Sequence, residues 1–240
     1  MKKIKKGPVP ASLIQWKTNN ATVPQNLFYG EGNFPHEDLL VKLLNEQGQI
    51  CAYTLKRLDI KSAHIEHLKP QTLCKSEDDA REIAGYPRHR EDVAWLNLVA
   101  CFPEPNPAAP PSYGAVKKDN WWHSVNFVSP LTTGCESRFD FDVEGGIAPK
   151  MPADIPAATT ITKIGLDDEK LCELRKCAYI SAGIHRRSLK PITSLTQVER
   201  LIAKWSAKNA ETGAFPEFCV PLIQVAKQYA QFLRNRGINT

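Results

Sequence analysis

Residues 63–70 read AHIEHLKP, and within them His64, Glu66 and His67 place two imidazoles and a carboxylate close together. In an extended segment, alternation puts His64 and Glu66 on one face, and Ile65 and His67 on the other. A carboxylate can hold a metal ion while a neighbouring histidine takes a proton from water. Taken alone, such a stretch is more often a solvated polar turn before a proline. The rest of the chain decides between these two interpretations.

Length and composition indicate a folded protein. A chain of 240 residues suffices for one large domain, or for a core with a small helical appendage. Hydrophobic residues make up 42%, which supports a packed core and argues against global disorder. No apolar run approaches the ~20 residues that span a bilayer. The basic residues 1–6 are not followed by the apolar segment of a signal peptide. We therefore expect a cytoplasmic protein with no membrane association.

Charge and cysteine content narrow the class further. The net charge of +5 permits a polyanionic substrate, but it is weaker than that of an autonomous nucleic-acid binder. A partner protein could therefore supply much of the substrate binding. The seven cysteines are an odd number in a chain without an export signal, so we expect reduced thiols.

Periodicity and breakers predict the organisation of the chain. We expect an irregular N-terminal arm over 1–35, a core over 36–156 and a helical C-terminal subdomain over 157–240. Within these, the apolar pattern predicts helices over 36–48, 76–86 (with Ser76 as N-cap), from 167 onward, 194–208 and 217–235. A strand or tight hairpin is expected over 50–58, a proline-rich loop over 102–112, a hairpin over 138–147 and a connector over 149–156.

A second informative stretch is WLNLVAC, residues 95–101. An asparagine inside an apolar run must find hydrogen-bond partners if it is buried. Asn97 is therefore a candidate for bracing a neighbouring loop.

A histidine, an asparagine some thirty residues later and then a lysine-bearing segment follow the order of the HNH (ββα-metal) nucleases. More specifically, the chain resembles HNH nucleases of the Septu type (PtuB-like), including those found beside retrons. The resemblance is carried by boxes that occur in order: QGQICAY (47–53), IEHLKPQ (65–71), WLNLVAC (95–101), ESRF (136–139), GIAP (146–149) and TITKIGL (160–166). One such box would be weak evidence, whereas the ordered set is hard to produce by chance.

The resemblance implies an α+β fold with a ββα-metal core surrounded by helices. It also implies a metal-dependent endonuclease that cleaves DNA or a structured RNA such as tRNA in antiphage defence. His67 would be the general base, Glu66 and His67 the metal-site residues, and Asn97 the brace of the loop, with His64 in support. Lys69, Lys117 and Lys118 are the candidates for contacting nucleic acid.

The implied cofactor is a divalent ion, by preference Mg²⁺, with Mn²⁺ or Zn²⁺ as alternatives. The implied partners are a PtuA-like ATPase and, in a retron, the reverse transcriptase with its RNA–DNA product. The helical C-terminal part is the expected surface for the partner.

The chain departs from the family at the zinc ribbon, which has four cysteines in two pairs. In this chain, two of these four positions are cysteines, Cys51 and Cys101. The other two positions are occupied by Thr54 and Tyr113. Two thiolates with a threonine and a tyrosine make a poor tetrahedral site, so we expect no tightly held structural zinc.

A second departure lies nearer the chemistry. Gly114 stands where the family has an aspartate, so the ligand on the helix is missing or displaced. The possible substitutes are Asn106, Asp119, Asn120 and His123. The departures motivate an alternative function, an HNH-fold binding module with eroded ligands that only docks on its ATPase.

Overall fold

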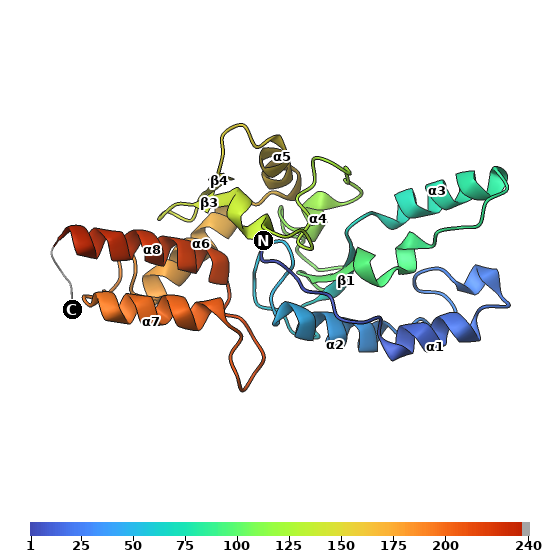
Figure 1. Cartoon of the computed structure of the whole chain (residues 1–240), viewed down its shortest axis with the longest axis horizontal. Helices are drawn as coiled ribbons and strands as arrows, with labels where there is room; N and C mark the ends of the chain where they lie inside the picture. Colours follow the sequence, from blue (N-terminus) through green and yellow to red (C-terminus); the bar gives the residue numbers. More distant parts are fainter. Residues whose placement is uncertain (237–240) are drawn as a thin grey trace.

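Helices and small sheets alternate along the chain in the computed structural model, which describes residues 1–236 (Figure 1). The helices are α1 (Ala11–Asn19), α2 (His36–Gln47), α3 (Gln71–Ile83), α4 (Ala115–Lys118), α5 (Ile155–Ile164), α6 (Glu169–Ser181), α7 (Leu195–Ser206) and α8 (Cys219–Asn235). The strands are β1 (His64–His67), β2 (Leu98–Cys101), β3 (Phe139–Phe141) and β4 (Ile147–Pro149). The α+β class expected from the sequence is confirmed.

Two antiparallel strand pairs organise the fold. β1 pairs with β2, with His64 opposite Cys101 and His67 opposite Leu98. β3 pairs with β4 as the hairpin predicted around Gly145 and Gly146. The whole of β2 is buried, whereas β1 alternates between half-buried and buried residues. His64 and Glu66 are the half-buried residues of β1, and Ile65 and His67 are the buried ones.

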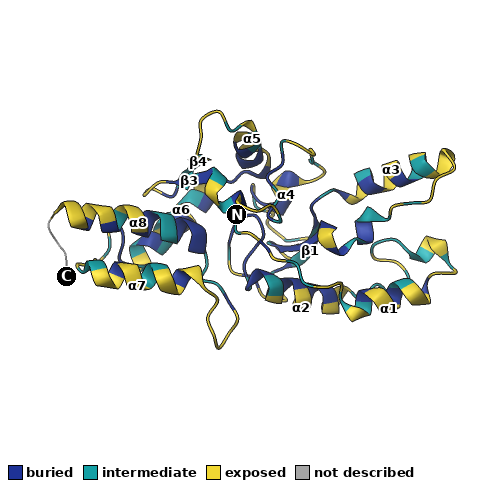
Figure 2. Ribbon diagram, viewed as in Figure 1, coloured by how far each residue is buried: buried dark blue, intermediate teal, exposed yellow. Residues whose placement is uncertain are grey.

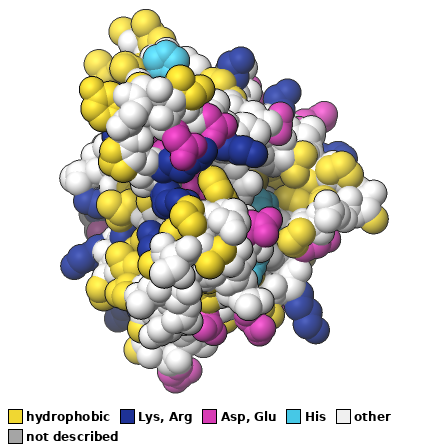
Figure 3. All heavy atoms as spheres, turned by 90° about the vertical axis from the view of Figure 1, so that its right-hand side faces the viewer, with side chains coloured by type: hydrophobic (Ala, Val, Ile, Leu, Met, Phe, Trp, Pro, Cys, Tyr) yellow, Lys and Arg dark blue, Asp and Glu magenta, His cyan; other side chains and the backbone are white. Residues whose placement is uncertain are grey.

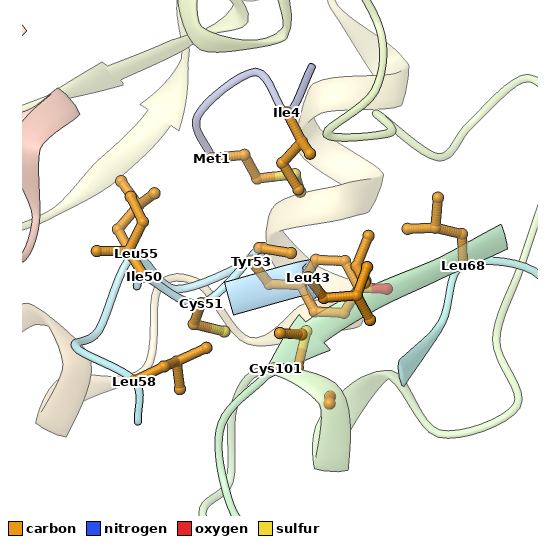
Figure 4. Close-up of a cluster of buried hydrophobic side chains, with 14 of the residues drawn as sticks. Met1, Ile4, Leu43, Ile50, Cys51, Tyr53, Leu55, Leu58, Leu68 and Cys101 are labelled. Atoms are coloured by element: carbon orange, nitrogen blue, oxygen red, sulfur yellow. The ribbon is translucent and has the colours of Figure 1, made fainter. Parts of the chain in front are cut away.

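The main hydrophobic core surrounds β1 and β2. The apolar stripe of α2, predicted from Leu39, Leu40, Leu43 and Leu44, is buried against it, and α2 ends at Gly48 in the left-handed conformation that suits a helix stop. Figure 4 shows part of this core, where side chains from the chain start, α2, the 50–58 turn and β2 meet. The core thus fixes the position of β1 from several sides.

A second core lies in the C-terminal helices. It contains Tyr179 of α6, Val198 and Trp205 of α7, and Val225 and Leu233 of α8. In Figure 2, α7 and α8 bury their facing sides and expose their outer sides. The first turn of α8 belongs instead to the main core, so the two cores share this helix.

Several sequence predictions about elements need correction. The arm over 1–35 is not wholly irregular, because it contains α1 and because its basic tip packs inward at Met1 and Ile4. The predicted connector over 149–156 contains the start of α5, which Asp154 caps. The helix expected from Ser76 begins at Gln71, directly after Pro70.

Other predictions hold. The helices expected over 194–208 and 217–235 are α7 and α8, and the Ser194 hydroxyl accepts a hydrogen bond from the Gln197 N–H as the predicted cap. The 50–58 stretch forms a tight hairpin with one bridge between Ile50 and Arg57. Among residues 1–236, no helix is both long and apolar enough to cross a bilayer.

Candidate active site

A cleft of about 610 Å³ opens along β1. It is lined by the strand itself, the start of α3, the 103–107 loop, the α4 region and two side chains from the N-terminal part of the chain, Tyr29 and His36. Figure 3 views the end of the molecule that carries α1 and α3, where histidine surface shows in a recess. His64, Glu66 and His67 all line the cleft, so the structure brings the predicted residues of β1 to one site.

His67 is the most deeply held of these side chains, with 7% of its surface exposed. Its Nε2 lies 2.9 Å from the Asp92 carbonyl oxygen. Since a carbonyl can only accept, Nε2 carries the hydrogen and Nδ1 keeps the lone pair. The Tyr29 ring meets the imidazole edge-on, with 4.5 Å between centroids. The ring is therefore fixed in both tautomer and orientation.

The electrostatics keep His67 ready to accept a proton. Burial lowers its pKa, and this outweighs the opposite effects of the Asp92 carbonyl and the Glu66 carboxylate. The imidazole is thus neutral near pH 7, which is the form that a general base needs.

Glu66 does not face open solvent as a free ligand. Its Oε1 accepts a hydrogen bond of 2.9 Å from the Lys118 ammonium, and its Oε2 lies 3.7 Å from His64 Nε2. Burial raises the pKa of Glu66, but His64 and Lys118 lower it further, and the net shift is downward. The carboxylate is therefore ionised and already paired on both oxygens.

His64 completes this charged cluster. Its Nδ1 donates a hydrogen bond to the Pro103 carbonyl, and its Nε2 faces Glu66. Burial lowers its pKa, while Glu66 and the Pro103 carbonyl raise it by more, so the net shift is upward. The supporting role predicted for His64 stays a prediction, and its contact in the structure is with Glu66.

Asn97 holds the loop that follows β1. Its Oδ1 accepts from the Lys69 N–H at 2.8 Å, and its Nδ2 donates to the carbonyls of Lys69 and Glu91, each at 3.0 Å. The buried Asn97 side chain thus joins the loop after β1 to residue Glu91 by hydrogen bonds. The loop it braces begins one residue after His67, so Asn97 is a positioning residue for the site.

The predicted nucleic-acid-binding lysines are placed differently from one another. Lys117 is exposed, whereas Lys69 is paired with Glu77 and Glu91, and Lys118 is buried against Glu66. Only Lys117 of the three therefore presents its charge to the outside.

The residues of the cleft do not fit a divalent metal ion. Glu66 and His67 project from opposite faces of β1, and Glu66 is occupied by Lys118. Of the possible substitute ligands, Asn106, Asp119 and Asn120 line the cleft, while His123 accepts hydrogen bonds from the Val125 and Asn126 N–H groups outside it. Within residues 1–236, no three His, Cys, Asp or Glu side chains gather as metal ligands do.

The positions of the family's zinc ribbon lie together in space. Cys51 and Cys101 are both buried next to each other (Figure 4), and the Phe102 N–H donates to Cys51 Sγ at 3.4 Å. The Lys56 ammonium lies 3.2 Å from Tyr113 Oη and 3.6 Å from the centroid of the Phe102 ring. Lys56 thus lies among these side chains. The expected absence of structural zinc stays a prediction.

Sequence reasoning missed two contributions to the cleft. The Tyr29 Oη and the His36 Nε2 lie 2.7 Å apart. The sequence predicts an irregular arm around Tyr29 and a helix start at His36. The available indication was the aromatic clustering over residues 28–36, FYGEGNFPH. The Asp92 carbonyl could not be identified, because a main-chain atom has no signature in the sequence.

Comparison with known proteins finds a similar protein over part of the chain. No protein-family model matches the chain. The chain is 28% identical over 135 residues to a protein of Vibrio cholerae serotype O1 biovar El Tor that is named as a predicted HNH endonuclease of retron Vc95. The match covers 54% of this chain and 58% of that relative, so the chain spans little more than half of the relative's length. Over that part, the chain is similar to a retron HNH endonuclease, which supports the HNH endonuclease family.

Proposed function

We propose that this chain is an HNH endonuclease of the Septu or retron-associated type, which hydrolyses phosphodiester bonds of DNA or structured RNA. The observation that carries the proposal is the neutral, tautomer-fixed imidazole of His67 in a cleft along β1. We interpret β1, β2 and α4 as the ββα unit of that fold, because Lys118 of α4 hydrogen-bonds to Glu66 and to the His67 carbonyl oxygen. The similarity to a retron HNH endonuclease supports this interpretation.

In the proposed reaction, His67 Nδ1 takes a proton from a water molecule as its oxygen attacks phosphorus. The bond from phosphorus to the leaving sugar oxygen breaks, and that oxygen takes a proton from solvent. His67 is the catalytic residue, while Asn97 and the Asp92 carbonyl hold it in place. Since the residues around Glu66 do not form a divalent-ion site, no step of this mechanism uses a metal.

We also propose that the chain acts in antiphage defence with a PtuA-like ATPase and, in a retron, with the reverse transcriptase and its RNA–DNA product. The retron name of the relative supports this context. Co-expression with a PtuA-like ATPase should give a complex that stays together in size-exclusion chromatography. If the two proteins elute separately, the proposed partnership is wrong.

His67→Ala tests the proposed chemistry. Removing the base should reduce cleavage of a panel of duplex DNA, single-stranded DNA and tRNA by about 10²- to 10⁴-fold. His89→Ala is the matched control, because His89 is exposed and does not line the cleft. Cleavage that persists at the wild-type rate in His67→Ala would exclude His67 as the base.

The alternative is a binding module that docks on the ATPase without cleaving. The pairing of Glu66 with Lys118 and the glycine at position 114 favour it, because both remove a ligand that the family uses. The alternative predicts that wild type and His67→Ala both protect cells and both bind the ATPase. The nuclease proposal predicts that His67→Ala binds the ATPase but no longer protects.

A further inference from the structure

Lys118 is a buried lysine at the centre of the cleft's charged cluster. Only 1% of its surface is exposed, although it lies in a run of basic residues that the sequence suggests is solvated. Burial of an ammonium group away from water costs on the order of several kcal/mol, as it does for other ions, unless oxygen atoms surround the group. Its contacts therefore show what the site is built to hold.

Three oxygen atoms surround the Lys118 Nζ. They are Glu66 Oε1 at 2.9 Å, the His67 carbonyl oxygen at 2.9 Å and the Asp119 carbonyl oxygen at 3.4 Å. One carboxylate and two carbonyls are also the kind of oxygen donors that hard divalent cations prefer. A metal ion bound to Glu66 Oε1 would thus need the position that the Lys118 ammonium occupies.

The local backbone structure positions Lys118 next to Glu66. α4 is a single turn that begins after Gly114, whose φ of 75° is open to glycine and strained for other residues. A Cβ at position 114 would also lie 3.2 Å from Thr54 Cγ2. The glycine that replaces the family's aspartate therefore lets α4 approach closely, so that Lys118 reaches β1.

We infer that the Lys118 ammonium is the resident cation of this site and stands where Glu66 would otherwise bind a divalent metal ion. The positive charge of Lys118 thus takes the place of a metal ion in holding β1. Lys118 is a positioning residue, since its bond to the His67 carbonyl fixes the main chain of the catalytic residue while the Asp92 carbonyl fixes the ring. The metal-binding part of this inference is independent of the proposed nuclease activity, and only its catalytic part rests on it.

Titration with Mn²⁺, followed by electron paramagnetic resonance of the free ion, tests the inference directly. Wild type should show no Mn²⁺ binding that depends on Glu66. Lys118→Ala should gain about one Mn²⁺ per chain, bound at least about tenfold more tightly than any Mn²⁺ on wild type, because Glu66 Oε1 loses its ammonium partner. Lys118→Ala combined with Glu66→Gln should lose that site, and Lys117→Ala, which removes an exposed neighbour, should not create one.

Two outcomes would overturn the inference. One is a Mn²⁺ ion bound by the wild-type chain and lost in Glu66→Gln, which needs no Lys118 variant and so stands even if Lys118→Ala fails to fold. The other is a folded Lys118→Ala chain, checked by circular dichroism, that binds no more Mn²⁺ than wild type does. Lys118→Met, which keeps the length of the side chain without its charge, serves if alanine leaves too large a cavity.

Activity provides the second readout. Wild-type cleavage should persist in excess EDTA, while Lys118→Ala should lose cleavage and regain part of it with added Mn²⁺ or ethylammonium. Abolition of wild-type cleavage by EDTA, with recovery on adding Mg²⁺, would contradict the inference. If wild type cleaves no nucleic acid at all, the proposed function fails, yet the Mn²⁺ titration still decides whether Lys118 excludes a metal.

Discussion

At the scale of single residues, substitution of Asn97 tests how far its hydrogen bonds stabilise the fold. Asn97→Ala removes the hydrogen bonds of Asn97 to Lys69 and Glu91 and leaves the half-buried Lys69 N–H without its partner. The free energy of unfolding should fall by about 2–3 kcal/mol, which is in the range for unsatisfied buried polar groups. Denaturant unfolding of the purified chain measures this difference.

Leu96→Ala is the control for that measurement, because the neighbouring Leu96 is 63% exposed and should change stability by less than about 0.5 kcal/mol. Equal stabilities of the two variants would contradict the bracing role. Asn97 could be identified from the sequence, since an amide in an apolar run has to be satisfied. Lys118 could not, because a lysine after another lysine is typical of a solvated surface until the tertiary fold supplies Glu66.

At the scale of elements, the start of α5 shows how a cap and a proline can be misread. Prolines at 149, 152 and 156 suggested a connector, yet Pro156 falls in the first helical turn, where proline is favourable. Asp154 caps that helix by accepting from the Ala157 N–H at 2.9 Å. For α3, the predicted start is too late. The helix begins directly after Pro70, before the predicted cap at Ser76.

Asp154→Ala should lower the free energy of unfolding by about 1–2 kcal/mol, as the loss of an N-cap does. The Arg138 guanidinium hydrogen-bonds to the same carboxylate and is the main cause that lowers the pKa of Asp154. A lowered pKa stabilises the fold above the unfolded value of about 3.9 and loses that effect as the pH falls through the folded value. The difference between wild type and variant should therefore shrink in acid below about pH 4.

Thermal unfolding between pH 7 and pH 3 measures that dependence. Asp167→Ala serves as the control, since Asp167 is exposed and caps no helix. A pH-independent difference between Asp154→Ala and wild type would show that the Arg138 pair contributes nothing to stability.

At the scale of the whole molecule, the two cores are joined rather than separate. The main core crosses the predicted boundary at residue 157, because it includes Ala157, Ile161 and Ile164 of α5 together with Phe218 and the start of α8. Gln224 of α8 also donates to the Phe139 carbonyl and accepts from the Phe141 N–H of β3. The sequence showed the helices through their apolar stripes, but a stripe does not say which core it joins.

The shared helix predicts cooperative unfolding. Differential scanning calorimetry of the full chain should give a single transition, with the calorimetric and van't Hoff enthalpies equal. A chain cut after residue 156 should not unfold cooperatively, since it lacks part of the main core. Two well-separated transitions in the full chain, or a cooperative 1–156 fragment, would show that the two parts are independent domains.

The location of the cleft has a consequence for assembly. All the side chains that line it come from residues 29–120, at the part of the molecule that carries α1 and α3, whereas α7 and α8 form the opposite end (Figure 1). A protein bound on the exposed faces of those two helices would leave the cleft uncovered. Substrate and such a protein could then occupy the chain at the same time, without competing for surface.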